Sequence, residues 1–498
     1  MPGVRATRRP PPNEARHRRR TGGPGRRAAC SPDPTLSRVK PTMGLPDCIE
    51  IEPLPGIVEA RVTVPGSKSV TNRALVLAAL SRGEVTLTGA LWSEDTRIMV
   101  EALRRLGFEL AVEPDPEEPC NRRIHVRGRG GEIPRAGTPD RPLELYVGNA
   151  GTAARFLAAL TALGRGSYRL WGTERMHQRP QAPLFAALRQ LGCRIDSVAD
   201  RLPAVIHAAG PRPGACTVTI AESSQFASAL LLCAPWAGWT VEVTGENPEE
   251  SPYVAMTLKL RDRFPRDGGV FAVEPDASSG SYFWAANDPG WLRHQLDRDP
   301  AMLDPLRWPV QVRHWPAPDL QVDARFPGVW QTLVAAGRAV EGRAHAMEVE
   351  ISRQRDLGDA IMTAIVMAPL CGVVCRFTDL GRLRLQECER VAALRTELRR
   401  CGARVEEAGD TLTVWPSALH GAEIQTYQDH RMAMCFAILG LKVGGIRIQN
   451  PACVAKTFPN FFAKLAAPPP AGLGVRIRDA ATGQWLEARR LIVEEYER

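Results

Sequence analysis

Beyond residue 42 the sequence has no excess of charge of either sign. The chain has 498 residues and a formal net charge of +9, but residues 1–42 hold eleven of its lysines and arginines and only two acids. The rest of the chain, 43–498, therefore contains 53 basic and 53 acidic side chains. This balance excludes a basic nucleic-acid-binding surface on the folded body as the leading interpretation.

Long hydrophobic runs are also missing. The longest apolar stretches, such as 74–80 and 226–237, are shorter than the roughly 20 residues that a membrane-spanning helix needs. The N-terminus lacks the apolar segment that forms the centre of a signal peptide. We therefore expect neither a membrane partner nor a nucleic-acid partner. With 44% hydrophobic residues, the chain is nevertheless long and apolar enough for two or more buried cores.

The twelve cysteines show no spacing typical of a metal site or a disulfide framework. Cys371 and Cys375 lie four residues apart on an apolar stretch, where both are predicted to be core residues rather than ligands. Scattered cysteines in a chain of this length are typical of a reducing compartment, so we expect a cytoplasmic protein. A zinc site or a disulfide framework is the less favoured alternative.

The two ends of the sequence differ from its body. Residues 1–42 are rich in Arg, Pro and Gly and are predicted to be a disordered basic extension, which we suspect is absent from the mature protein. Residues 466–472 (AAPPPAG) predict a linker. Residues 475–497 predict a small hairpin with its turn at 480–483. The whole segment 466–498 is thus predicted to be a linker and a C-terminal appendage without a chemical role.

One local pattern occurs three times in the body. The segments 101–107, 186–192 and 396–402 each have apolar residues three and four apart, end in glycine, and are followed by alternating apolar residues. The spacing and the terminal glycine predict the end of a helix, and the alternation predicts a strand. A helix–strand unit that recurs over hundreds of residues indicates an α/β architecture built by duplication.

Three turns before predicted helices carry small hydrogen-bond donors. Residues 62–77 (VTVPGSKSVTNRALVL) predict a strand, a turn and a helix, with Lys68 at the helix N-terminus and Arg73 further along it. Residues 147–155 (VGNAGTAAR) and 222–231 (ESSQFASALL) repeat this arrangement. Each segment alone also fits an ordinary capped helix. Because helix N-termini favour anions, the three together suggest a site for a phosphorylated or carboxylated ligand.

Several cations stand out because the body has no basic excess. Arg179 precedes Pro180 in a constrained segment, Arg431 precedes an apolar helix, and Lys456 lies in the segment AKTFP. Arginine suits bidentate contacts with carboxylates and phosphates, and lysine supplies a point charge or a proton. Any one of these residues alone would be interpreted as an ordinary surface charge.

Two acids are candidates for proton transfer. Asp359 lies at the start of a strongly apolar helix, and Glu387 lies three residues before Arg390. If both converge on the anion site, they supply a general base and a proton carrier. The structural alternatives are a helix N-cap and an ion pair between residues three apart.

Seven segments in order closely resemble the 5-enolpyruvylshikimate-3-phosphate (EPSP) synthase family, over residues from about 43 to about 465. The sister family, UDP-N-acetylglucosamine enolpyruvyl transferase, carries Lys-Asn where this chain has Lys68-Ser69, and is therefore the weaker match. The seven segments are Pro65–Arg73, Gly148–Thr152, Arg175–Pro180, Ser223–Gln225, Asp276–Ser279, Tyr427–Met432 and Ala455–Pro459.

The resemblance implies a two-domain enolpyruvyl transferase fold of the α/β class. Each domain would consist of three repeated βαβαββ units with their helices inward, an inside-out α/β barrel. One domain would span residues 67–273. The other would combine residues 43–66 with 274–465, and the ligands would bind in the cleft between the two.

The resemblance also implies a reaction in the shikimate pathway, which leads to chorismate and the aromatic amino acids. The enolpyruvyl (carboxyvinyl) group of phosphoenolpyruvate would be transferred to the 5-hydroxyl of shikimate 3-phosphate, with release of phosphate. The only partners implied are these two small molecules, with no metal or organic cofactor, and the chain would act as a monomer.

Matching positions give each predicted site residue a role. The catalytic residues would be Asp359, Glu387 and Lys68, with Asp359 accepting the hydroxyl proton and Glu387 exchanging protons at the methylene carbon. Shikimate 3-phosphate would contact Lys68, Ser69, Arg73, Ser223, Ser224, Gln225, Tyr253, Asp359, Arg382 and Gln386. Phosphoenolpyruvate would contact Lys68, Asn149, Gly151, Thr152, Arg179, Gln225, Arg390, Arg431 and Lys456.

One segment departs from the family pattern. The family has Asn, Lys and Asp where this chain has Arg382, Gln386 and Glu389. Loss of the ammonium at 386 would weaken a charge-assisted contact of roughly 1.5–3 kcal/mol. Arg382 is a candidate to supply that charge, although a guanidinium is larger than an ammonium and would point in a different direction. Residues 287–318 are also unlike the family.

These departures keep a second hypothesis open. The chain would then be a diverged relative that acts on another cyclic alcohol, or a protein that binds such ligands without turnover. The presence of both Asp359 and Glu387 favours catalysis, because binding alone does not need the two acids.

Overall fold

The structure is a computed structural model that describes residues 44–245, 251–341 and 347–493, and residues from Gly44 onward form one compact unit. The predicted disordered extension, 1–42, lies outside the described residues. None of the described helices combines the length and the apolar composition that crossing a membrane requires.

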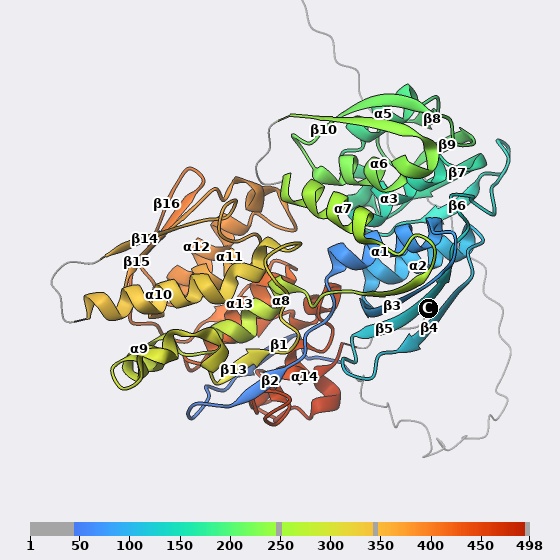
Figure 1. The fold of residues 1–498 in the computed structure, drawn as a ribbon. Coiled ribbons are helices and arrows are strands. Elements are labelled where there is room, and N and C mark those ends of the chain that lie inside the picture. Colours follow the sequence, from blue (N-terminus) through green and yellow to red (C-terminus); the bar gives the residue numbers. More distant parts are fainter. Residues whose placement is uncertain (1–43, 246–250, 342–346, 494–498) are drawn as a thin grey trace, which may run out of the picture. The chain divides into compact units, whose positions relative to one another are not determined.

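Four four-stranded sheets share one pairing pattern, as predicted for an α/β chain built by duplication (Figure 1). In two of them the strand order along the chain is first, second, fourth, third, and each of the other two includes a strand from a distant part of the chain. In each sheet the first two strands are parallel and the other two pairings are antiparallel. Two sheets, in spatial order, are β6 (Leu143–Tyr146), β7 (Arg165–Trp171), β9 (Ala204–Ala209), β8 (Arg194–Ser197), and β14 (Glu348–Ser352), β15 (Val374–Thr378), β17 (Thr411–Val414), β16 (Val405–Ala408). The other two are β12 (Gly269–Ala272), β3 (Glu84–Leu91), β5 (Asn121–Arg127), β4 (Leu110–Pro114), and β18 (Glu423–Ile424), β19 (Arg447–Gln449), β1 (Cys48–Ile51), β20 (Ile477–Asp479).

Chain connections within these sheets follow the expected βαβαββ order. Helices α3 (Gly151–Thr161) and α5 (Ala182–Gln190) connect the strands from β6 to β8, and α11 (Ile361–Met367) and α12 (Arg390–Arg400) connect those from β14 to β16. In the described residues, two further sheets contain only a parallel pair. These pairs are β10 (Gly214–Thr219) with β11 (Trp239–Thr244), and β2 (Ala60–Val62) with β13 (Val310–Val312).

Six helices lie inside the sheets, in two groups of three. Within each group the helices pack on one another, and nearly all of their residues are buried. A helix that is apolar on all sides must be enclosed, so their composition explains why they form the centre. The first group is α1 (Lys68–Leu80), α3 and α6 (Ser224–Ala237), and the second is α8 (Ala277–Ala285), α11 and α13 (His430–Gly440).

The remaining helices cover the outside or connect the units. They are α2 (Glu94–Arg105), α4 (Glu174–Gln178), α7 (Ser251–Arg263), α9 (Pro289–Leu296), α10 (Phe326–Val340) and α14 (Phe461–Ala466).

The buried apolar side chains form two separate clusters. One cluster draws on residues 70–273 together with Leu320, and the other on residues 49–64 and 282–491. This division supports the predicted domain boundaries, which themselves remain a prediction. Cys371 and Cys375 are fully buried in the second cluster, which confirms them as core residues.

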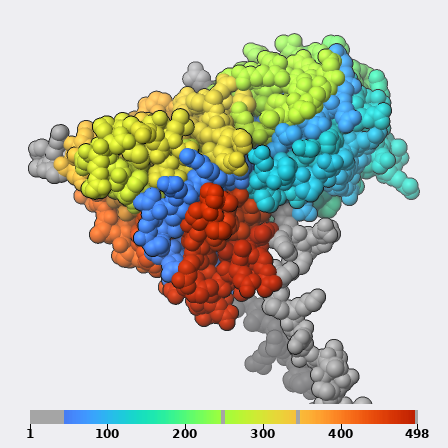
Figure 2. Space-filling model, turned by 60° about the horizontal axis from the view of Figure 1, so that its bottom comes forward, coloured from blue at the N-terminus to red at the C-terminus, as the bar shows by residue number. Residues whose placement is uncertain are grey.

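The predicted turn at 480–483 is confirmed, but the hairpin is short within the described residues and its first strand also joins a sheet. The N–H groups of Asp479 and Leu486 donate to the carbonyls of Gln484 and Ile477 across the turn, while β20 pairs along its length with β1. Val475 and Ile477 are buried in the second cluster, which explains the preference for the sheet. In Figure 2 the blue N-terminal strands accordingly lie beside the red C-terminal segment.

The three predicted helix ends are confirmed, each with the same cap. Gly107, Gly192 and Gly402 follow helices α2, α5 and α12 with φ of +92°, +88° and +91°. At each end the next residue's N–H donates to a carbonyl in the last helical turn (Phe108 to Leu103, Cys193 to Leu188, Ala403 to Leu398). Glycine adopts this left-handed backbone without the strain that a side chain adds.

We predict opposite effects for two exposed glycine-to-alanine substitutions. A Cβ at Gly192 meets no atom within 4 Å, so Gly192→Ala tests the backbone conformation alone and should lower the free energy of unfolding by about 1–2 kcal/mol. Gly328 in α10 also has free space and no positive φ, so Gly328→Ala should leave stability unchanged or raise it. Denaturant titration checks both, and equal effects of the two substitutions would contradict the proposed cap.

Candidate active site

Predicted site residues cluster at the N-termini of the inward helices. Lys68 opens α1, Gly151 opens α3, and Asp359 directly precedes the start of α11. Ser223 caps α6 and accepts a hydrogen bond from the Gln225 backbone N–H at 3.3 Å. Free N–H groups and the helix dipole make each such end favourable for an anion.

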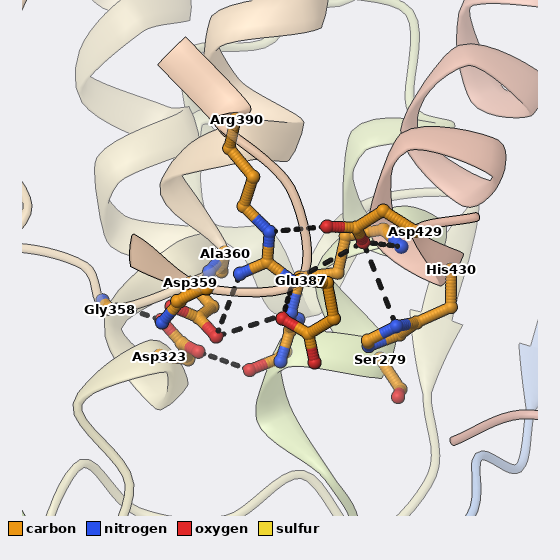
Figure 3. A network of polar contacts seen from close by, with 12 residues as sticks. Ser279, Asp323, Gly358, Asp359, Ala360, Glu387, Arg390, Asp429 and His430 are labelled. Atoms are coloured by element: carbon orange, nitrogen blue, oxygen red, sulfur yellow. Dashed lines mark hydrogen bonds and ion pairs between the residues drawn. The ribbon is translucent and has the colours of Figure 1, made fainter. Parts of the chain in front are cut away.

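A buried guanidinium, that of Arg390, forms the centre of a charged network (Figure 3). The Arg390 side chain is 1% exposed, and its Nε and Nη2 donate to the two oxygens of Asp429 at 2.6 and 3.2 Å. Arg390 Nη2 also lies 2.8 Å from Glu387 Oε2, and Nη1 lies 3.6 Å from Asp359 Oδ2. One cation therefore connects three carboxylates from three parts of the chain.

Asp359 is surrounded by cations. Its Oδ1 accepts a hydrogen bond from Arg353 Nη2 at 2.9 Å, and its Oδ2 lies 3.3 Å from Arg431 Nε. Burial alone would raise the pKa of Asp359, but the positive charges of Arg431, Arg353 and Arg390 outweigh burial and hold this pKa well below its usual range. In this arrangement Asp359 is ionised and weakly basic.

Glu387 has a comparable environment. Its Oε1 lies 2.7 Å from Lys456 Nζ, in addition to the Arg390 contact. Burial would raise its pKa, yet the charges of Arg390 and Lys456 lower that pKa well below the usual value. Burial lowers the pKa of His430 far enough to keep the imidazole neutral, despite the opposing charges of Asp429 and Glu387.

Two arginines beside α3 have no carboxylate partner within ion-pair distance among the described residues. Arg179 Nη1 donates to the Asn149 carbonyl at 3.1 Å, and buried Arg155 donates to the carbonyls of Pro180 and Gly151 at 2.8 and 3.2 Å. A Cβ on Gly151 would lie 2.5 Å from Arg179 Nη2 and 2.8 Å from Arg155 Nη1, so a side chain there would displace these guanidiniums. Burial lowers the pKa of both arginines, as expected for positive charge that no carboxylate compensates.

Lys68 connects this region electrostatically with the Arg390 network. Its ammonium forms an ion pair with Asp95 at 3.1 Å. Burial alone would lower the pKa of Lys68, but the carboxylates of Asp95 and Glu387 raise it overall. Glu387 and Asp95 also oppose the lowering of the Arg179 pKa. The predicted catalytic residues and phosphoenolpyruvate-binding cations thus share one electrostatic environment.

The residues predicted to contact shikimate 3-phosphate lie mainly at α1, α6 and α7. Arg73 is 2% exposed, and its guanidinium donates to the Ser69 carbonyl, Thr257 Oγ1 and Ser228 Oγ at 2.9, 2.7 and 3.1 Å. These contacts give Arg73 a role within the core. Ligand contacts by Ser69, Arg73, Ser223, Ser224, Gln225, Tyr253 and Thr152 remain predictions.

The two unusual residues, Arg382 and Gln386, have different surroundings. Arg382 Nη1 donates to the Glu222 carbonyl at 2.7 Å, and its charge lowers the pKa of Arg155 and Arg179. Gln386 Nε2 donates to Asp359 Oδ1 at 3.3 Å, while its buried Oε1 has no hydrogen-bond partner among the described residues. Arg382 therefore adds charge beside α3 and α6, whereas Gln386 lies beside Asp359.

Sequence reasoning missed three charged residues of the network. Asp429 lies within a recognised motif, but its pairing with Arg390 was not predicted. Asp95 lies in the first turn of α2 and pairs with Lys68. In the sequence it looks like any acid at the start of a helix, so nothing indicated this pairing. Arg353, 4% exposed and bonded to Asp359, stands in no local pattern that would reveal it.

Known proteins were compared with this sequence and this fold. The sequence model of the EPSP synthase family, described as EPSP synthase (3-phosphoshikimate 1-carboxyvinyltransferase), matches residues 54–266 and 331–465. A 3-phosphoshikimate 1-carboxyvinyltransferase from Trichormus variabilis is 36% identical over 446 residues, which cover 84% of this chain and 98% of the relative. The enzyme of that name from Opitutus terrae is 38% identical over 459 residues, with 85% and 98% covered.

Solved structures agree on the fold. An EPSP synthase structure from Acinetobacter baumannii superposes with a TM-score of 0.65 at 20% identity, covering 87% of this chain and 100% of that one. This likeness confirms the predicted two-domain enolpyruvyl transferase fold. The curated relatives are more than one third identical to this chain over most of its length. These matches identify the family, which similarity of fold alone cannot do. This chain belongs to the EPSP synthase family.

Proposed function

We propose that this protein is a 3-phosphoshikimate 1-carboxyvinyltransferase. It transfers the enolpyruvyl group of phosphoenolpyruvate to the 5-hydroxyl of shikimate 3-phosphate and releases inorganic phosphate. The observation that carries this proposal is a pair of buried guanidinium nitrogens, Arg390 Nη1 and Arg431 Nε. Each lies within ion-pair distance of Asp359 Oδ2, at 3.6 and 3.3 Å, but makes no hydrogen bond among the described residues. Buried donors of this kind are rare in native proteins, and an anionic ligand would satisfy them.

The proposed phosphoenolpyruvate site combines these donors with Arg179, which has no carboxylate partner within ion-pair distance among the described residues, and with the ammonium groups of Lys68 and Lys456. Arg390, Arg431 and Lys456 would bind one side of the ligand, and Lys68 and Arg179 the other. The N-terminus of α3 at Gly151 adds backbone N–H groups. Phosphoenolpyruvate carries both a phosphate and a carboxylate, so two anionic groups match two sets of cations.

Proton transfer would depend on Asp359 and Glu387. The 5-hydroxyl oxygen attacks the central carbon of phosphoenolpyruvate while Asp359 takes the hydroxyl proton, and Glu387 in its protonated form delivers a proton to the methylene carbon. The resulting tetrahedral intermediate then loses phosphate and one methyl proton, for which Glu387 is the proposed carrier. Both carboxylates are too weakly basic while fully ion-paired. Anion binding would draw the guanidiniums toward the ligand and raise the pKa of these acids.

We also propose that the chain acts as a cytoplasmic monomer. All candidate site residues come from one chain. The eleven cysteines of the described residues are free thiols, as a reducing compartment would maintain.

The direct test is a phosphate-release assay on the full chain. Phosphate should be released from phosphoenolpyruvate only when shikimate 3-phosphate is present. Omission of either substrate is the control. Release without shikimate 3-phosphate, or no release with both substrates, would reject the proposed function.

Replacing the proposed base should separate catalysis from binding. Asp359→Ala should lower turnover about 1,000-fold, to a small residual rate, while shikimate 3-phosphate binding, followed by calorimetric titration, stays measurable. Asp356→Ala is the matched control, because Asp356 lies three residues away and pairs with exposed Arg355, so its turnover should be retained. Full activity of Asp359→Ala would remove Asp359 from the mechanism.

Gln386→Lys should strengthen phosphoenolpyruvate binding, because it restores an ammonium beside Asp359 and the buried donors. We expect the KM for phosphoenolpyruvate to fall about tenfold, which corresponds to the lower end of the free energy that a charge-assisted contact contributes. Gln386→Met, similar in length but uncharged, should produce no such decrease. An unchanged or higher KM in Gln386→Lys would mean that Arg382 already supplies this charge.

A further inference from the structure

We propose that Asp323 is a positioning residue that fixes the backbone on both sides of Asp359. Asp323 lies in the short helical turn Val322–Arg325 and is 6% exposed. Its Oδ1 accepts hydrogen bonds from the backbone N–H of Gly358 at 2.6 Å and of Ala360 at 3.2 Å. These two residues flank the proposed base, so one carboxylate oxygen holds the peptide groups before and after it (Figure 3).

The glycine at 358 makes this close approach possible. A Cβ at Gly358 would lie 3.1 Å from Asp323 Oδ1 and 3.0 Å from Val322 Cγ1. Both distances are tighter than ordinary van der Waals contact, so a side chain here would shift Asp323 by a few tenths of an ångström relative to the two N–H groups. The sequence around Asp359 is therefore adapted to the carboxylate of Asp323.

Asp323 is itself held in place from the other side. Its Oδ2 accepts a short hydrogen bond from Ser278 Oγ in the first turn of α8. Two residues earlier, buried Gln321 accepts from the Ala277 backbone N–H at 3.0 Å and donates to the Pro275 carbonyl at 2.8 Å. The segment 321–323 thus ties the start of α8 to the loop that carries Asp359.

Rigid support matters here because three guanidiniums attract the Asp359 side chain from different directions. If its backbone could follow them, the carboxylate would move with the ion pairs and lose its alignment with the substrate hydroxyl. Catalytic groups require tight positioning, and a displacement of about 1 Å costs about 100-fold in rate. The family match covers residues 54–266 and 331–465, so it assigns Asp323 no role.

The test compares three variants of the full chain by phosphate release. Asp323→Ala removes both acceptors and should lower kcat about 100-fold while the KM of each substrate stays nearly unchanged. Asp323→Asn keeps one carbonyl oxygen for the two N–H groups, and Ser278 can accept from its amide, so kcat should recover to within a few-fold of wild type. Gly358→Ala should reproduce the selective loss of kcat with Asp323 intact.

A double variant distinguishes positioning from general damage. If Asp323 acts through Asp359, then Asp323→Ala combined with Asp359→Ala should release phosphate no more slowly than Asp359→Ala alone. Asp288→Ala is the control for loss of a helix cap, because partly buried Asp288 accepts the Trp291 backbone N–H at 2.5 Å at the start of α9 and makes no contact with Asp359. It should lower stability without lowering kcat.

The inference rests on the proposed function, and the two can fail separately. No phosphate release by the wild type would reject the function. With an active wild type, three results would overturn the role of Asp323. They are full activity of Asp323→Ala, an Asp323→Asn variant as inactive as the alanine variant, and additive losses in the double variant. If Asp323→Ala does not fold at the assay temperature, Gly358→Ala decides, and a normal kcat in that variant overturns the inference.

Discussion

The buried guanidinium of Arg390 holds together the parts of the chain on which the site depends. Its partners Asp429, Glu387 and Asp359 precede α13, α12 and α11 respectively, so one side chain links three helix starts. Asp429 is completely buried, and removing one partner from such a pair typically costs 3–5 kcal/mol because it leaves an unpaired buried charge. Alternative positions of these helix starts are therefore strongly disfavoured.

The same ion pairs impose a chemical constraint. Arginines that neutralise Asp359 and Glu387 also make these acids poor proton acceptors. Substrate anions can relieve the constraint, because their phosphate and carboxylate groups compete for the same guanidiniums. Binding and activation of the base would then be one event.

Local signals predicted much of the fold. The glycine-terminated segments 101–107, 186–192 and 396–402 identified helix ends and the strands after them. A left-handed helix cap favours glycine, and glycine at this position can be recognised in the sequence. The turn at 480–483 was also predicted, but the pairing of β20 with β1, more than 400 residues earlier, was not. Pairing at that separation has no local signature, and alternating apolar residues fit a hairpin and a sheet edge equally well.

The site was predictable where the family resemblance gives a residue a role. Lys68, Asp359, Glu387, Arg390, Arg431 and Lys456 were all expected to lie near one another, and the structure brings them into one charged network. Arg353 and Asp323 were not expected, because their importance arises only from contacts with Asp359 that folding creates. Gln386 was noticed as a departure, but its contact with Asp359 became evident only in three dimensions.

The competition between carboxylates and substrate anions is the central claim, and the ionisation of Asp359 measures it most directly. The carboxyl carbon signal that Asp359→Asn removes from a ¹³C NMR spectrum identifies this residue, and its titration can be followed with and without phosphoenolpyruvate. We expect Asp359 to stay ionised below the ordinary carboxyl range in the free protein, and its pKa to rise when phosphoenolpyruvate is bound. A pKa that is unchanged or lower in the bound state would contradict the claim.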